Sequence, residues 1–382
     1  MALEALLSQQ IIGLSESIDD RVAALLVAGT GITLTYNDGA GTLTIAASST
    51  GIGGSTGRTD NAVLRADGTG GATLQNSAFV IADIATSSPN NTVNHASIQA
   101  TGATSNVSVS VVPKGTGAFC LQVPDGTSAG GNVRGSNAID LQTSRSAANQ
   151  VASGSSSLAA GASNRASGGN SVALGFGNAA TGLESRAIGY ENTASGSGAI
   201  AIGLRNTVSG SDGTVALGDY NFVTQTGGLA TGRRARADRA GQRCHAHNQF
   251  ATEGDAQYTG FVLRNKTTNA TPTTLFCDGS SARLTVNAGE IIGFVANIIG
   301  SKSDGSAIAH YVRKGAIKRV GTTTTLAYVE TVGTDYEDNA STDVAITADD
   351  TNDALQINVT GIAGETWRWF ADVQAADLGF GT

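Results

Sequence analysis

The stretch NSVALGFGNAATGLESRAIGYENTASGSGAIAIGLRNTVSG, residues 170–210, decides the fold of this chain. It belongs to a longer series in which nine glycines fall at strict seven-residue intervals: Gly154, Gly161, Gly168, Gly175, Gly182, Gly189, Gly196, Gly203 and Gly210. Doubling the interval gives a 14-residue repeat, and the same period holds for Asn164, Asn178, Asn192 and Asn206. A period this short excludes helical hairpins and propeller blades. It predicts a stacked β-coil with two short strands and two tight turns in each rung.

Residues that alternate along each strand face opposite sides of the coil. One side carries Val or Ile and Leu or Ile, as in Val172 and Leu174, and the other carries a column of alanines such as Ala173. The sequence leaves open which side fills the interior. Arg186 interrupts the aliphatic column, so it either turns outward or lies on a partly solvated face. We expect the asparagines to hydrogen-bond from rung to rung and the glycines to adopt positive φ.

The predicted coil is thin. Rungs stack at about 4.8 Å, so about six of them build a rod of about 30 Å. Each rung buries about two aliphatic side chains, a gain on the order of 3–5 kcal/mol before chain entropy is subtracted. A lone coil is therefore marginal, and we expect several copies to associate about the rod axis.

Composition narrows the class of protein further. The net charge of −8 argues against nucleic-acid binding, because neutralising phosphates needs a basic surface. Three widely spaced cysteines, Cys120, Cys244 and Cys277, form no CxxC pair and predict isolated buried thiols rather than a disulfide framework or zinc site. No apolar run reaches the roughly 20 residues that a membrane-spanning helix needs.

The remaining segments divide the chain into five parts. Residues 1–28 carry apolar positions such as Leu7, Ile11 and Leu14 at helical spacing, which predicts an amphipathic helix rather than a signal peptide. This helix either packs on its own domain or forms a bundle with identical helices. A β-rich shaft is expected over 29–145, the β-roll over 146–237, a neck over 238–256 and a β-sandwich knob over 257–382.

The repeats NSVALGFGNAATG (170–182) and SGAIAIGLRNTVSG (197–210) resemble the YadA-type head of trimeric adhesins, a left-handed parallel β-roll. Three flanking segments resemble tail-fibre and receptor-binding proteins of bacteriophages: NAVLRADGTGGATLQNSAF (61–79), VPDGTSAGGNVRGSNAIDLQTSRSAANQVASG (123–154) and GDAQYTGFVLRNKTTNATPTTLFCDGSSARLTV (254–286). These resemblances cover more than half of the chain.

The resemblance implies an all-β, homotrimeric fibre of a phage virion. Its N-terminus would attach to a tail or baseplate protein, and its C-terminal end would recognise a glycan or lipopolysaccharide on the host surface. Bacterial adhesins of this kind carry a secretion signal and a membrane anchor; this sequence shows neither, which favours the virion. A purely structural tail component and a polysaccharide depolymerase remain as alternatives.

Two polar loops of the knob are candidate receptor sites, because loops on a rigid sandwich often carry binding. The first holds Tyr336, Asp338 and Asn339, and the second holds Asp350 and Asn352. Their oxygens could bind calcium that bridges an anionic glycan. The alternative for the second loop is an ordinary turn rich in Asp and Asn.

The segment after the roll holds two further candidates. Arg233, Arg234 and Arg236 could bind an anionic polysaccharide, or else form a solvated collar that pairs with acids such as Asp238. His245 and His247 would point to one face of a strand. In a trimer, six imidazoles could hold an axial metal such as iron or nickel, an arrangement that H-x-H pairs in some phage fibres resemble. The alternative is a packed or solvated pair.

No nucleophile–base constellation or phosphate-binding loop is recognisable in the sequence. We therefore expect no enzymatic activity and no certain cofactor. Trp367 and Trp369 alternate on one strand and are expected in the sandwich core rather than at a sugar site.

Overall fold

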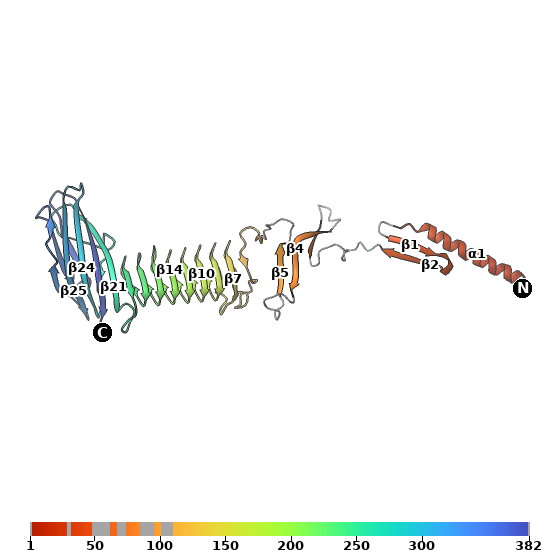
Figure 1. The fold of residues 1–382 in the computed structure, drawn as a ribbon, viewed down its shortest axis with the longest axis horizontal. Helices are drawn as coiled ribbons and strands as arrows, with labels where there is room; N and C mark the ends of the chain where they lie inside the picture. Colours follow the sequence, from red (N-terminus) through yellow and green to blue (C-terminus); the bar gives the residue numbers. More distant parts are fainter. Residues whose placement is uncertain are drawn as a thin grey trace. The chain divides into compact units, whose positions relative to one another are not determined.

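The computed structural model describes residues 2–28, 32–47, 62–66, 74–84, 95–100 and 110–380 (Figure 1). The chain divides into two compact units, residues 1–111 and 112–382. One α-helix lies in the described residues and the rest of the regular structure is almost entirely β-strand, which confirms the predicted all-β class with an N-terminal helix.

The N-terminal unit contains the predicted helix, followed by a hairpin. Helix α1 (Ala2–Leu25) leaves large apolar side chains exposed, among them Leu3, Leu7 and Ile11. Strands β1 (Ile32–Asn37) and β2 (Thr42–Ala47) pair antiparallel around a short 3-10 turn. An antiparallel sheet follows, formed by β3 (Ala62–Ala66), β4 (Leu74–Ile84) and β5 (His95–Ala100).

The repeat region is a parallel β-solenoid, as predicted. Each rung gives a longer strand to one sheet, which we call the shaft sheet, and a two-residue strand to a second, six-stranded sheet. The shaft sheet contains β6 (Phe119–Cys120), β7 (Ile139–Ser144), β8 (Leu158–Ala162), β10 (Val172–Phe176), β12 (Arg186–Tyr190), β14 (Ile200–Leu204), β16 (Val215–Asp219), β18 (Leu229–Arg233) and β20 (Arg243–Ala246). The second sheet contains β9 (Arg165–Ala166), β11 (Ala179–Ala180), β13 (Thr193–Ala194), β15 (Thr207–Val208), β17 (Phe222–Val223) and β19 (Arg236–Ala237). Parallel pairing thus extends on both sides of the segment 146–237, because β7 and β20 continue it without the glycine period.

The structure decides which strand face fills the solenoid. The alanine column, including Ala173, Ala187 and Ala201, has no exposed surface and pairs in register from rung to rung. At these positions the interior holds only alanine, and the aliphatic columns face outward. Arg186 points outward with them and is exposed, the first of its two predicted alternatives.

A buried ladder of side-chain amides runs along the solenoid, as expected. Asn178 Nδ2 and its backbone N both donate to Asn164 Oδ1, at 3.0 and 2.9 Å. The same bonds recur at Asn192 and Asn206. Asn221 extends the ladder through its backbone N, although one extra residue precedes it.

The repeat glycines serve two purposes. Gly175 and its equivalents have positive φ, for example 112° at Gly175, as expected. Gly168 and its equivalents do not. A Cβ at Gly168 would lie 1.8 Å from the carbonyl oxygen of Gly182, so this glycine is required by the close approach of the next rung.

Buried ion clusters close the solenoid interior at both ends. At the first rungs, the fully buried Asp140 carboxylate binds Arg134 at 2.7 Å and Arg145 at 3.1 Å. At the last rung, Arg239 is buried against Glu290 and Asp377 of the knob. A buried charge needs such partners, so each cluster fixes how the solenoid meets its neighbouring segment.

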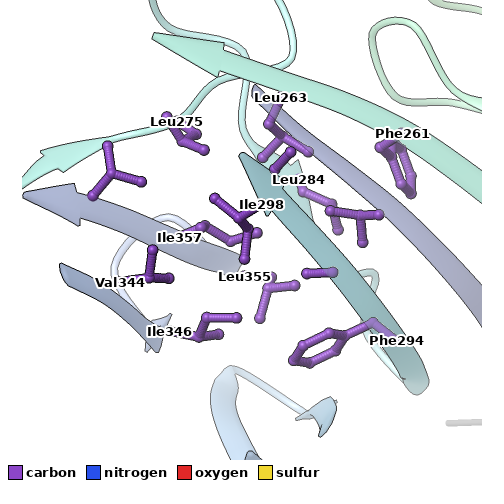
Figure 2. Packing of buried hydrophobic residues seen from close by; sticks show 14 of the residues in the cluster. Phe261, Leu263, Leu275, Leu284, Phe294, Ile298, Val344, Ile346, Leu355 and Ile357 are labelled. Atoms are coloured by element: carbon purple, nitrogen blue, oxygen red, sulfur yellow. The ribbon is translucent and has the colours of Figure 1, made fainter. Parts of the chain in front are cut away.

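The knob is a β-sandwich, as predicted. Its larger sheet holds β21 (Ala256–Thr267), β30 (Trp367–Gly379), β24 (Glu290–Lys302), β25 (Ile308–Val320), β26 (Thr323–Thr331) and β27 (Tyr336–Glu337). The smaller sheet holds β22 (Thr273–Thr274), β29 (Ala354–Thr360), β23 (Leu284–Thr285) and β28 (Asp343–Asp349). Figure 2 shows the apolar core between them, with Phe261 and Phe294 facing Leu355 and Ile357. Trp367 and Trp369 are buried there, as expected.

One hydrogen-bonded sheet runs through both parts. Strand β20, the last of the solenoid, pairs antiparallel with β21, the first of the knob, and places His245 opposite Tyr258. The shaft sheet and the larger knob sheet therefore form a single 15-stranded sheet. Strands β26 and β27 lie at its far edge from the shaft.

Candidate functional site

The outer face of the shaft sheet carries an unusual amount of apolar surface for a solvated sheet. We call this the apolar shaft face, and its residues are Leu158, Val172, Leu174, Ile188, Ile200, Ile202, Val215, Leu217 and Leu229. Ile202 is 37% exposed and Leu217 is 40% exposed, although each lies beside similar side chains in the neighbouring rungs. Contiguous exposed apolar surface marks an interaction site.

The knob also carries exposed apolar surface. On the outer face of the larger knob sheet, Phe370 of β30 lies opposite Ile299 of β24. Val295 lies on the same face of β24 as Ile299. Phe370, Ile299 and Val295 are each more than 40% exposed. Because the two sheets are one, this surface and the apolar shaft face lie on the same side of it, separated by polar positions such as Arg243 and Gln374.

A second set of exposed side chains lines one corner of the solenoid, and the sequence analysis missed it. Phe176 and Tyr190 stack with ring centroids 5.2 Å apart. Arg205 lies over the rings of Tyr190 and Tyr220 and binds Glu191 at 2.6 Å. These residues lie at the last position of the longer strand in successive rungs, or one residue after it. Comparing that position from one repeat to the next could have found them in the sequence.

The five predicted receptor residues do not form one site. Tyr336, Asp338 and Asn339 lie at the far edge of the large sheet, where β27 pairs with the start of β25. Tyr336 Oη donates to Asp338 Oδ1 at 2.8 Å, and the backbone N of Ile308 donates to Asp338 Oδ2 at 2.8 Å. The Ile308 amide and the Tyr336 hydroxyl lower the pKa of Asp338, so its carboxylate stays charged.

Asp350 and Asn352 lie beyond the opposite end of β28. Asp350 accepts a hydrogen bond from the backbone N of Thr324 in β26, and Asn352 Nδ2 donates to Asp349 at 2.8 Å. The seven residues of β28 separate the two loops, a span of about 20 Å. Both loops border the far edge, but a single small ligand cannot contact both.

The predicted arginine site is likewise divided. Arg233 is exposed at the end of β18, whereas Arg236 lies in β19 of the other sheet. Arg234 stacks over Tyr220, and Arg236 binds Asp238 at 2.8 Å, as the collar alternative expects. Anion binding by these arginines stays a prediction.

His245 and His247 are both exposed, and burial alternates along this segment, so they share one face as predicted. His245 Nδ1 lies 3.0 Å from Thr231 Oγ1. In the described part of the chain, no three His, Cys, Asp or Glu side chains converge to hold a metal ion. A metal shared between chains at these histidines stays a prediction.

The three thiols are free in the described residues; Cys244 is buried as expected, whereas Cys120 and Cys277 are only partly buried. Burial raises the pKa of Cys244, and burial raises the pKa of Cys277 to about 11, so both stay protonated at neutral pH.

α1, the one α-helix among the described residues, lacks the apolar run needed to cross a bilayer.

Comparison with known proteins agrees with the repeat assignment. Residues 152–178 and 180–206 match two copies of the YadA head domain repeat. No curated protein matches the chain. Two solved structures show a remote likeness. One is the tailspike protein gp49 from Acinetobacter baumannii bacteriophage Fri1, a capsular polysaccharide depolymerase, at 9% identity and a TM-score of 0.21. The other is the tailspike protein of Acinetobacter phage vB_ApiP_P1, at 10% identity and a TM-score of 0.21.

These alignments cover 62% and 58% of this chain but only 44% and 51% of the tailspikes. This chain thus spans about half the length of each. The expectation that the protein is not an enzyme is wrong as stated, because gp49 is a polysaccharide depolymerase. Residues 152–178 and 180–206 thus match YadA head repeats, and they fold as part of a β-solenoid that leads into a β-sandwich knob.

Proposed function

We propose that this chain is part of a homotrimeric phage tail fibre that attaches the virion to a host-surface glycan. The observation that carries the proposal is the apolar shaft face, which lies outside a solenoid whose interior holds only small side chains. Two further copies of the same face would cover it. The match to YadA head repeats supports the same assembly, because the heads that these repeats resemble belong to trimeric adhesins.

Energetics favour association over a lone solenoid. Alanines bury little apolar area, so the interior of each rung contributes little against chain entropy. Each aliphatic side chain of the shaft face would add about 1–2 kcal/mol if an associating copy buried its exposed part. The exposed leucines of α1 give the N-terminal segment a similar reason to form a bundle, leaving attachment to a tail or baseplate protein as its expected role.

Receptor contact is assigned to the far edge of the knob, around Tyr336 and Asp338. Three identical tips would strengthen weak glycan contacts by avidity. Cleavage of the bound glycan remains open, since binding and hydrolysis begin with the same contact.

The first test measures assembly. Ile202→Asp places a charge on the apolar shaft face, and Thr207→Asp is the matched control on the outer side of the other sheet in the same rung. Light scattering should give a trimer for the unmodified chain and the control, and smaller species for Ile202→Asp. A monomeric unmodified chain would refute the proposal.

The second test measures attachment and cleavage together. Labelled full-length protein is incubated with a panel of capsulated bacteria and their capsule-free mutants, and with the purified capsules. Selective binding to capsulated cells supports the proposed function, and absence of binding to every strain contradicts it. Released oligosaccharides would identify a depolymerase.

A further inference from the structure

A pocket of about 730 Å³ lies where the last rung of the shaft meets the knob. Its volume falls within the range of about 300–1,000 Å³ that is typical of ligand sites. Three segments form its walls: the end of β19 and the following turn at 236–239, the loop at 250–255, and the loop at 287–290, with Phe380 beside them.

The walls are held in place by hydrogen bonds. Asp255 accepts bonds from the backbone N–H groups of Phe250, Ala251 and Thr252, at 2.6 to 2.8 Å. Gln257 bridges this loop to β19 through both the N–H and the carbonyl of Arg236. The pocket is therefore formed before any ligand arrives.

The pocket stays open in the proposed assembly. Arg236 belongs to the six-stranded sheet, on the other side of the solenoid from the apolar shaft face. Association through the shaft face would leave this side of the molecule in solvent.

Several polar groups in the walls have capacity to bind a ligand. Arg239 lies in the lining, and its guanidinium is already bound by Glu290 and Asp377. Glu253 is half-buried and forms no ion pair or hydrogen bond there. Asp238 Oδ2 accepts hydrogen bonds from Arg236 Nε at 2.8 Å and from Asn287 Nδ2 at 3.2 Å, so a carboxylate, a guanidinium and an amide lie side by side in the wall.

Charge and apolar surface identify the ligand class. Four carboxylates, Asp238, Glu253, Asp255 and Glu290, face two guanidinium groups in the lining, so an anionic ligand would be repelled. Phe250 and Phe380 are 75% and 46% exposed and offer ring surface to a weakly polar face. A sugar ring combines hydroxyls that both donate and accept with a C–H face that packs on aromatic rings.

We propose that this pocket binds an uncharged hexose unit of a surface polysaccharide. The proposal rests on the proposed function for the source of the sugar, but the binding itself is measured separately. It adds a second contact with the glycan, on the side of the fibre rather than at its far edge.

The test uses the full chain and saturation-transfer NMR with the methyl pyranosides of glucose, galactose and N-acetylglucosamine. Ala288→Trp fills the pocket from an exposed wall position, and Glu253→Ala removes the free carboxylate. Glu330→Ala is the matched control, since Glu330 is an exposed carboxylate paired with Lys314 on the knob. At least one glycoside should bind, Ala288→Trp should abolish binding, Glu253→Ala should weaken it at least tenfold, and the control should not change it.

Three outcomes would overturn the proposal: undiminished binding by Ala288→Trp, equally strong binding of methyl glucuronide, or no binding of any glycoside by a chain that attaches to cells. In the last case the proposed function stands and the pocket fails. Binding of a glycoside by a chain that attaches to no cell would support the pocket and refute the proposed function.

Discussion

Replacing Asn192 by alanine tests whether the amide ladder holds the rungs together. Asn192 is fully buried; its Nδ2 donates to Asn178 Oδ1, Ile188 O and Gly203 O, and its Oδ1 accepts the backbone N–H of Asn206 at 3.0 Å. Alanine leaves that N–H buried without an acceptor, which costs about 1–3 kcal/mol, and each lost carbonyl contact costs about 1 kcal/mol more. We expect a loss of about 3–5 kcal/mol in the free energy of unfolding.

Urea unfolding followed by circular dichroism measures this loss, at one fixed protein concentration because the chain is proposed to associate. Thr193→Ala is the matched control, because Thr193 is the next residue and faces outward; we expect a change below about 0.5 kcal/mol. Asn192→Asp should destabilise the protein more than alanine at neutral pH, since a buried carboxylate would face carbonyl oxygens, and less at acidic pH. If Asn192→Ala and the control differ by less than about 1 kcal/mol, the ladder does not stabilise the solenoid as argued.

Three further predictions concern other parts of the chain. Gly168→Ala should lower the free energy of unfolding by about 3 kcal/mol, because its Cβ would meet the backbone of the next rung. Gly213→Ala has open space around the new Cβ but a φ of 79°, so it should lower that free energy by only about 1 kcal/mol. Thermal melts of the two variants compare these losses. Burial alone would raise the pKa of Asp255, but hydrogen bonds from the backbone amides of residues 250–252 outweigh burial and lower that pKa. The Asp255 carboxylate therefore stabilises the fold above pH 3.8, and this stabilisation is lost as the pH falls through the lowered pKa. The melting temperatures of the unmodified chain and Asp255→Asn should therefore differ most above pH 3.8 and converge below it; a constant difference would contradict the assignment. If His245 and His247 bind an axial metal, elemental analysis should find it in the purified protein and not in the double alanine variant, and a metal-free purified protein would exclude the site.

The solenoid could be predicted from the sequence because every rung repeats one backbone conformation. Glycine at a positive φ and asparagine at a buried corner are required at each turn, so their period is visible without any structure. The same logic missed Asn221, because the extra residue near Gly213 shifts the count by one while the ladder continues. Alternation alone could not say which strand face lies inside; that depends on the interior width, which leaves room only for alanine on the inner face of the longer strands.

The pocket and the ion clusters could not be predicted, because their residues meet only in three dimensions. Arg239 belongs by sequence with the arginines at 233–236, yet it is buried because Glu290 and Asp377 reach it from distant strands. The two receptor loops are neighbours in sequence, separated only by β28, but a strand is extended and carries its two ends apart. Local sequence distance therefore misleads at strand ends, whereas it is reliable within the repeats.

The in-register stacking of the alanine column has a consequence for the reach of the molecule. The rungs that carry β8, β10, β12 and β14 pair in one register at a spacing of 14 residues, so one of them can be removed or duplicated as a unit. A deletion of 14 residues would shorten the rod by about 4.8 Å and leave both terminal ion clusters intact. The length of the solenoid that carries the knob can thus change in fixed increments of one rung.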